Sequence, residues 1–345
     1  MAEWKPEEES QLGFSSQADH LLMQTNVQNW GLVRIGQRQL PLGKIYEYPA
    51  LAGKNVDIYI IDTGVNINHT DFDDRAEWGA TIIDGGADAD NHGHGTAVAG
   101  IAAGRLQGVA KKAHIIAVKC LNDEGDGSVS DIIQGLHYVL GQVQARRPNK
   151  AVVNLSVEAD KSDALNEAID ALVRADIMVV AAAGNIDDNQ DKNACNYSPS
   201  SSSTALIIGA TDSNDNVASF SRSGPCIDLF APGVKITSDG GRANDIRVVS
   251  SGTSFSAPFV SGLAAVLLSE TGNQTAEKVK NRILTVSSSD ILEMQGTSPN
   301  LLLYTGFSDT KHAGTATSGT NQSNCDQRMA NAALFPLIVM LLLMT

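Results

Sequence analysis

Five short apolar segments rich in β-branched residues recur through the middle of the chain, each bounded by polar residues or glycine. They read VDIYIID (56–62), HIIAVKC (114–120), AVVNLS (151–156), IMVVAAA (177–183) and TALIIGA (204–210). Near-continuous apolar runs of this length are typical of buried strands in a parallel sheet. The chain is therefore expected to build its core around such a sheet.

A helical pattern separates two of these strands. The segment DALNEAIDALVRA (163–175) places Leu165, Ile169, Leu172 and Val173 on one face. Alternating strands and helices predict an α/β fold with a doubly wound, mostly parallel sheet and helices on both faces. Functional residues of such folds lie at the carboxyl ends of the strands. Asp62 and Asn185 both follow strands at such an end.

Length and charge restrict the class of protein. The 345 residues suit one large domain plus tails, and 42% hydrophobic residues can supply a sizeable core. A formal net charge of −14 argues against nucleic acid as a partner, because phosphate binding requires a basic face. That charge is interpreted as a solubility feature.

Three glycine-rich motifs carry an aspartate, a histidine and a serine in that order. They are IDTGV around Asp62, HGHGTAVAG around His94 and GTSFSAP around Ser254. A hydrolytic triad recurs on unrelated folds with different chain orders, and Asp-His-Ser is the order of the subtilisin type. On these motifs the chain resembles the subtilisin family. WGLVRIG (30–36), NACNYSP (193–199) and ASFSRSGPCIDLFAPG (218–233) resemble its proteinase K branch, and the resemblance covers residues 28–305.

The resemblance implies a serine endopeptidase. Ser254 would attack the scissile carbonyl, His94 would take its proton, and Asp62 would orient the imidazole ring. Asn185 matches the side-chain donor of the oxyanion hole, and the Ser254 N–H would be the second donor. A helix is expected from Ala257 to Leu268, with its positive end towards the developing charge. His92 and His69 are interpreted as loop and structural residues.

Two segments are expected to hold an extended peptide substrate. By resemblance these are Gly125-Asp126-Gly127 and Ser156-Val157-Glu158, and Ala183 and Gly184 are assigned to the same cleft. The family usually has Ser-Leu-Gly-Gly at the second segment, whereas this chain has SVEA. Glu158 then replaces a glycine at the rim of the P1 pocket. It could favour a basic P1 residue, turn to solvent and narrow the cleft, or block the pocket.

The same resemblance leads to predictions about the cysteines and about a bound metal ion. Cys195 and Cys226 match positions that are paired in thermostable relatives, which implies a disulfide and an oxidising compartment. Cys120, within an apolar run, is expected to be a free buried thiol. A structural calcium ion would be held by the carbonyls of Ser203 and Ala205 and the carboxylate of Asp228.

The two ends of the chain differ from the middle. Residues 1–27 are acidic and polar, without the apolar core of a signal peptide, and could be a remnant of a propeptide. Residues 306–323 have linker composition, and 324–345 form a polar spacer and an apolar tail. This pattern predicts a GPI-anchor signal with attachment at Asn321, or next at Ser323. The alternatives for this apolar tail are a tail anchor in a membrane and a C-terminal amphiphile that packs on the domain.

An anchor signal requires entry to the secretory pathway, so a signal peptide and a propeptide are expected to be missing from this sequence. The sequence thus predicts a secreted or cell-surface serine endopeptidase, monomeric, acting on proteins or peptides, with a propeptide or proteinaceous inhibitor as a further partner. One alternative is an inactive homologue that serves as a surface binding module. Another is an intracellular protease without an anchor.

Overall fold

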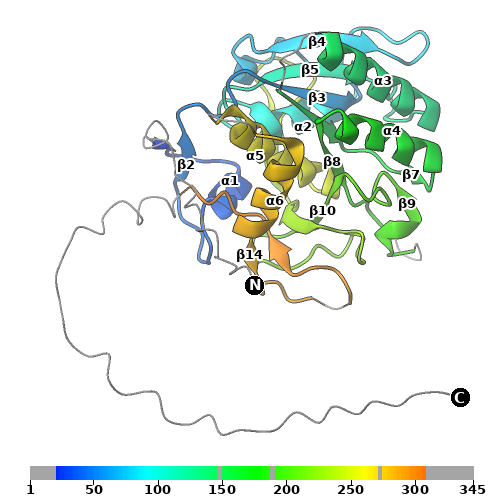
Figure 1. The fold of residues 1–345 in the computed structure, drawn as a ribbon. Coiled ribbons are helices and arrows are strands. Elements are labelled where there is room, and N and C mark those ends of the chain that lie inside the picture. Colours follow the sequence, from blue (N-terminus) through cyan, green and yellow to red (C-terminus); the bar gives the residue numbers. More distant parts are fainter. Residues whose placement is uncertain (1–20, 146–149, 187–190, 271–273, 295, 308–345) are drawn as a thin grey trace, which may run out of the picture.

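A nine-stranded sheet runs through the part of the chain that the computed structural model describes, which is residues 21–307 except 146–149, 187–190, 271–273 and 295. Its order is β14-β15-β11-β10-β8-β6-β3-β5-β4, and all neighbours are parallel except β14 and β15 (Figure 1). The strands are β3 (Val56–Asp62), β4 (Ala76–Thr81), β5 (His114–Lys119), β6 (Lys150–Leu155), β8 (Met178–Ala182), β10 (Leu206–Thr211), β11 (Leu229–Pro232), β14 (Ser288–Ser289) and β15 (Leu301–Leu302). The five predicted strands are confirmed as β3, β5, β6, β8 and β10.

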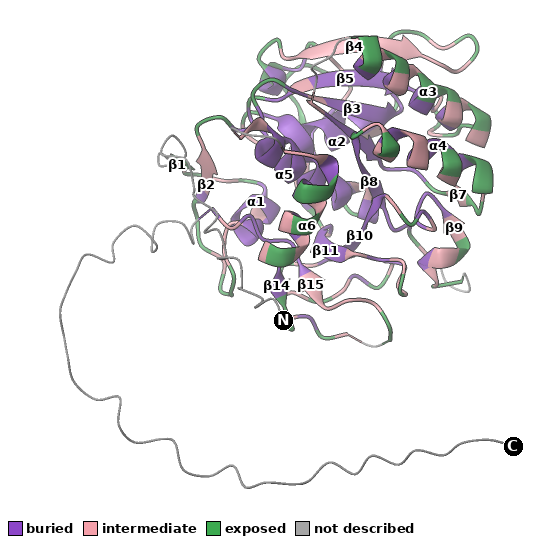
Figure 2. Cartoon of the chain, viewed as in Figure 1, coloured by how far each residue is buried: buried purple, intermediate pink, exposed green. Residues whose placement is uncertain are grey.

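Alternate side chains of these strands enter two separate cores. In β3, Ile58 and Ile60 join the cluster on one face, whereas Tyr59 and Ile61 join the cluster on the other. This period of two explains why the strands are apolar at nearly every position. Both faces are covered by helices, so the predicted doubly wound α/β fold is confirmed (Figure 2).

Helices of different composition cover the two faces. The first face packs against α1 (Trp30–Ile35), α2 (His94–Ala103), α5 (Ala257–Ser269) and α6 (Ala276–Val286). Helices α2 and α5 are buried along almost their whole length, as their Ala- and Gly-rich sequences allow. The second face packs against α3 (Val129–Ala145) and α4 (Asp163–Arg174), which expose their outer sides (Figure 2). Leu165, Ile169 and Leu172 of α4 are buried, and Val173 is partly buried.

Three two-stranded sheets and three short 3₁₀ helices complete the described fold. The pairs are β1 (Leu21–Gln24) with β2 (Tyr46–Pro49), β7 (Ala159–Asp160) with β9 (Tyr197–Ser198), and β12 (Ile236–Asp239) with β13 (Arg247–Ser250). The 3₁₀ helices are η1 (Thr70–Phe72), η2 (Ala194–Asn196) and η3 (Thr253–Phe255). Strand β1 lies before the predicted domain start at residue 28, and buried Phe307 lies after the predicted end at 305.

The predicted anchor signal lies outside the described residues, as do Asn321, Ser323 and Cys325. Among the helices that are described, none is both long enough and apolar enough to cross a bilayer. The anchor therefore stays a prediction.

Candidate functional site

Asp62 and His94 meet at the carboxyl edge of the sheet. Asp62 is the last residue of the central strand β3 and is fully buried. His94 is the first residue of α2, and its Nδ1 lies 2.8 Å from Oδ1 and 3.0 Å from Oδ2 of Asp62. Burial opposes protonation of His94, but the charge and hydrogen bond of Asp62, with the charge of Asp90, outweigh it and raise the pKa of His94.

The close approach of α2 to β3 depends on a glycine. A Cβ atom on Gly95 would lie 2.0 Å from the carbonyl oxygen of Gly64 and 3.1 Å from the Cβ of Asp62. Such distances are impossible for a side chain, so only glycine lets the helix start beside Asp62. This is the physical reason for a glycine directly after His94.

A second buried carboxylate, Asp90, fixes the loop before α2. It accepts hydrogen bonds from the Thr63 hydroxyl at 2.8 Å, the Gly93 N–H at 2.8 Å and the Thr96 N–H at 2.9 Å. These bonds join the residue after Asp62 to both sides of His94. Asp90 is not among the residues predicted from the sequence, because the buried position of an acidic residue four places before His94 can be recognised only from the fold.

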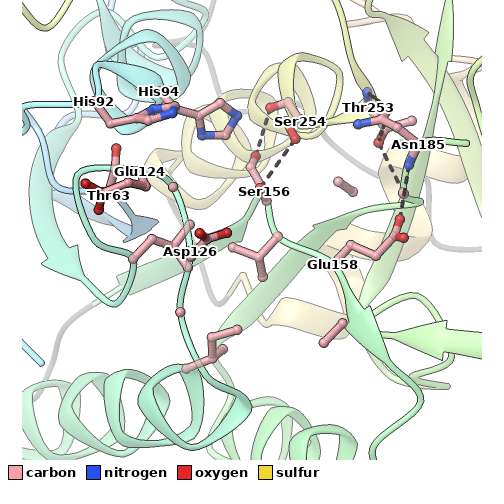
Figure 3. Close-up of a pocket in the computed structure, with 18 of the residues that line it drawn as sticks. Thr63, His92, His94, Glu124, Asp126, Ser156, Glu158, Asn185, Thr253 and Ser254 are labelled. Atoms are coloured by element: carbon pink, nitrogen blue, oxygen red, sulfur yellow. Dashed lines mark hydrogen bonds between the residues drawn. The ribbon is translucent and has the colours of Figure 1, made fainter. Parts of the chain in front are cut away.

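Ser254 lies in η3, directly before the long buried helix α5. Its Oγ donates to the carbonyl oxygen of Ser156 at 3.3 Å, and the Ser156 hydroxyl donates to the Ser254 carbonyl oxygen at 2.8 Å. The imidazole of His94 points towards Ser254 (Figure 3). Contacts between a nucleophile and its base often tighten only when substrate binds. The structure thus places Ser254 beside His94, with its hydroxyl turned to Ser156.

The side chain of Asn185 is oriented by the residue before Ser254. Its Oδ1 accepts hydrogen bonds from the Thr253 N–H at 2.9 Å and the Thr253 hydroxyl at 3.1 Å (Figure 3). These bonds fix the amide group of Asn185, whose Nδ2 carries two N–H donors, and Asn185 lines the same pocket as His94 and Ser254. Asn185 follows β8, as predicted.

A pocket of about 360 Å³ joins these residues. His94, Ser254 and Asn185 line it, and so do seven of the eight residues predicted to hold substrate, namely Gly125, Asp126, Gly127, Ser156, Val157, Glu158 and Gly184. The eighth, Ala183, is buried and does not line this pocket, whereas its neighbour Ala182 does. The fold thus brings together residues that are far apart along the chain, such as His94 and Ser254, which are 160 positions apart.

Glu158 adopts an arrangement that the sequence analysis did not consider. Its carboxylate forms a paired contact with Arg222, from Oε1 to Nη2 at 2.6 Å and from Oε2 to Nε at 3.0 Å. Oε2 also accepts the backbone N–H of Asn185 at 3.1 Å (Figure 3). The charge at the pocket wall is therefore already balanced by a buried arginine.

His92 and His69, which are predicted to be a loop residue and a structural residue, lie outside the contact between Asp62 and His94. His92 is exposed at the pocket rim, with its ring centre 6.2 Å from that of His94. His69 is buried and caps η1, since its Nδ1 accepts the N–H of Asp71 at 3.2 Å. Neither ring contacts the carboxylate of Asp62.

The disulfide implied by the resemblance is present. Cys195 and Cys226 are joined with a Cα–Cα distance of 5.4 Å. Cys120 is free and buried, as predicted, and burial raises the pKa of its thiol to about 12. Cys120 therefore stays protonated and unreactive at neutral pH.

Two of the three predicted calcium ligands, Ala205 and Asp228, lie beside a lysine of the chain itself, whereas the third, Ser203, has no described contact with that lysine. Lys280 of α6 places its Nζ 2.9 Å from the carbonyl oxygen of Ala205 and 3.6 Å from Oδ1 of Asp228. The other carboxylate oxygen of Asp228 accepts the N–H of Ile207 at 2.8 Å. As they stand, Ala205 and Asp228 do not fit a calcium site, because the ammonium group of Lys280 already contacts one oxygen of each residue.

Comparison with known proteins gives one consistent result. The model of the subtilase family matches residues 53–325. The subtilase-type proteinase psp3 of Schizosaccharomyces pombe is 40% identical over 297 residues, which cover 84% of this chain and 64% of psp3. Subtilisin-like protease 3 of Pseudogymnoascus destructans is 43% identical over 280 residues, which cover 80% of this chain and 68% of that protease. The chain thus spans about two thirds of the length of these relatives.

A solved structure agrees with the sequence matches. The crystal structure of a cold adapted subtilisin-like serine proteinase superposes with a TM-score of 0.75 at 36% identity. The match covers 81% of this chain and 99% of the solved chain. The fold and the sequence therefore lead to the same group of proteins.

Proposed function

Because the chain belongs to the subtilase family, we propose that it is a serine endopeptidase that cleaves proteins or peptides. The observation that carries this proposal is the contact between Asp62 and His94 at a pocket that also contains Ser254 and Asn185. A nucleophile, a base, an orienting carboxylate and an amide donor are the groups that amide hydrolysis needs.

The geometry supports a definite role for each group. Rotation of the Ser254 side chain away from the Ser156 carbonyl would bring its Oγ to Nε2 of His94. As Oγ bonds to the scissile carbonyl carbon, His94 takes the hydroxyl proton, and later it delivers that proton to the leaving amine. Asp62 holds Nδ1 of the ring and stabilises the imidazolium that forms in between.

The developing oxyanion would be stabilised by two donors. Nδ2 of Asn185 would be one of them, and the bonds from Thr253 to Oδ1 hold its amide group in place. The backbone N–H of Ser254 is the second donor, and it lies just before the positive end of α5. Donors that are fixed before the reaction need no reorganisation as charge develops.

A fluorophosphonate probe tests the proposal, because only an activated serine reacts with it. Wild-type protein should be labelled and should hydrolyse peptides, and Ser254→Ala should lose both properties while retaining its fold by circular dichroism. The rival reading, an inactive homologue that acts as a surface binding module, predicts no labelling of the wild type. Peptide hydrolysis that survives in Ser254→Ala would show that Ser254 is not the nucleophile.

We further propose that the chain works in an oxidising compartment, at the cell surface or outside the cell. The Cys195–Cys226 disulfide supports this, since structural disulfides persist mainly in such environments. Labelling of intact cells with a membrane-impermeant reagent, followed by detection of this chain, would test the location. Protein found only in the reduced form within the cytosol would contradict it.

A further inference from the structure

The carboxylate of Glu158 connects three parts of the molecule. It extends from the pocket wall after β6, forms a paired contact with Arg222, and accepts the backbone N–H of Asn185. Arg222 in turn is 1% exposed, and its guanidinium lies 3.5 Å from the ring centre of Tyr197 and donates to the carbonyl oxygen of Asp191. The paired contact therefore links the substrate pocket to the loop around the disulfide.

Gly184 provides the space for this contact. Its φ of +96° favours glycine, and a Cβ atom there would lie 1.8 Å from Oε2 of Glu158 and 2.8 Å from Nε of Arg222. The carbonyl oxygen of Gly184 accepts the N–H of Arg222 at 3.1 Å. The turn that carries Asn185 is thus held by the backbone of Arg222 on one side and by the carboxylate of Glu158 on the other.

A carboxylate beside an oxyanion hole is unfavourable unless its charge is balanced. Oε2 of Glu158 is 3.1 Å from the backbone nitrogen of Asn185, whose side chain faces the position of the developing negative charge. An unbalanced carboxylate and a developing oxyanion in the same partly buried site would repel each other. The bidentate contact with Arg222 offsets this repulsion and leaves the carboxylate of Glu158 without an unbalanced negative charge.

We propose that Arg222 is a positioning and specificity-determining residue, which neutralises Glu158 and holds its carboxylate against the turn that carries Asn185. The proposal rests on the proposed peptidase function. It implies that Glu158 gives the wild-type enzyme no preference for a basic P1 residue, because the carboxylate is committed to Arg222.

The test compares four forms of the full chain: wild type, Arg222→Met, Glu158→Gln and the double variant. Two matched peptides differ only at P1, where one has lysine and the other has norleucine, a neutral residue of similar length. Glu124 and Asp126 also line the pocket in all four forms. The quantity of interest is therefore the change between variants in the Lys/norleucine ratio of kcat/KM values, not the absolute ratio. Ser254→Ala defines the background, and hydrolysis that persists in it would count against the peptidase function instead.

In Arg222→Met we expect the Lys/norleucine ratio to rise about three- to fivefold, as a freed surface carboxylate would allow. We also expect kcat to fall about tenfold with little change in KM. The double variant should recover most of the kcat and the wild-type ratio, because the unbalanced charge is gone. A structural defect alone would not change the P1 ratio and would not be rescued in this way.

Glu158→Gln keeps the size of the side chain and provides a test even if Arg222→Met fails to fold. Its P1 ratio should equal that of the wild type. A fall of the ratio in Glu158→Gln would show that the carboxylate is free to attract basic residues, and this would overturn the proposal. An unchanged ratio and unchanged kcat in a folded Arg222→Met would overturn it equally.

A separate observation concerns the predicted calcium residues. Lys280 bridges α6 to the segments before β10 and β11, through the carbonyl oxygen of Ala205 and the carboxylate of Asp228. Its side chain is only 22% exposed, and that of Asp228 is 25% exposed. Carbonyl and carboxylate oxygens are also the kinds of ligand that Ca²⁺ takes.

We infer that the ammonium group of Lys280 takes the place of a metal ion here, so that an intramolecular cation connects these segments. Chelation should then affect wild type and Asp228→Asn equally. Lys280→Met should lower the melting temperature, and addition of calcium chloride should restore part of the loss, because the vacated oxygens can accept Ca²⁺. Lys161→Met, at an exposed lysine, is the matched control.

The inference fails in either of two cases. One is a chelator-induced drop of the melting temperature in wild type that is absent in Asp228→Asn, because that would locate a calcium ion at Asp228. The other is a Lys280→Met variant that melts at the same temperature as the wild type.

Discussion

The Nδ1 atom of His94 lies 2.8 Å from Oδ1 of Asp62, although the two residues are 32 positions apart. The contact joins the end of the central strand to the start of a helix that packs on one face of the sheet. It keeps the opposite nitrogen of the ring directed at Ser254 (Figure 3). From this contact we predict how the proposed activity depends on pH.

We expect kcat/KM to rise with pH and to reach a plateau only above a pKa that exceeds the ordinary value of 6.5. His94 must be neutral to accept a proton, and Asp62 and Asp90 raise its pKa against the effect of burial. The same shift means that protonated His94 stabilises the fold at low pH, a contribution that is lost as pH rises through the raised pKa.

Asp62→Asn should move this inflection to lower pH and reduce kcat by about 10⁴. The measurement is a pH profile of peptide hydrolysis for both forms. His92→Gln is the control, and its profile should match that of the wild type, since His92 is exposed and has no contact with Asp62. An inflection that stays in place in Asp62→Asn would contradict the assignment.

Asn185→Leu should lower kcat by about 10²–10³ and leave KM nearly unchanged. The substitution removes the Nδ2 donor, which would act mainly on the transition state. Asn214→Leu, at an exposed turn, controls for the gain of an apolar side chain. If KM rather than kcat changes in Asn185→Leu, the residue binds substrate and does not stabilise the oxyanion.

Asp90→Ala should destabilise the fold and lower activity together. The substitution leaves the buried donors of Thr63, Gly93 and Thr96 without an acceptor, at a cost of about 2–3 kcal/mol or more in the free energy of unfolding. Asp90→Asn keeps one acceptor oxygen and should lose less. Urea denaturation measures the free energy, and a change below about 0.5 kcal/mol in Asp90→Ala would show that the network is dispensable.

Removal of the disulfide should lower the free energy of unfolding by about 3–4 kcal/mol, the value for a loop closed across 31 residues. The comparison is between Cys195→Ser/Cys226→Ser and the wild type, measured in urea without a reducing agent. Reduction of the wild type should give the same loss, and the double variant should not respond to it. A response of the double variant to reductant would indicate a further disulfide.

The sequence by itself determined the architecture and the main site residues. Segments such as VDIYIID and IMVVAAA are apolar at almost every buried position, Asp62 being the exception, so their type and their place in a parallel sheet follow from local pattern. Gly95 could likewise be recognised from its motif, although the reason for it is tertiary, since a Cβ atom on Gly95 of α2 would lie 2.0 Å from the carbonyl oxygen of Gly64. Local signals of this kind can be read before any fold is known.

Only the tertiary structure decided which charges meet. Glu158 and Arg222 are 64 residues apart, and nothing in SVEA or SFSRSG indicates that the two side chains pair at the pocket wall. The same holds for Lys280 with Ala205 and for Asp90 with Thr63. Long side chains reach their partners across elements whose relative positions are fixed by the packing of the whole core. For this reason the sequence showed an acidic residue in the cleft, but the fold determined that its charge is balanced.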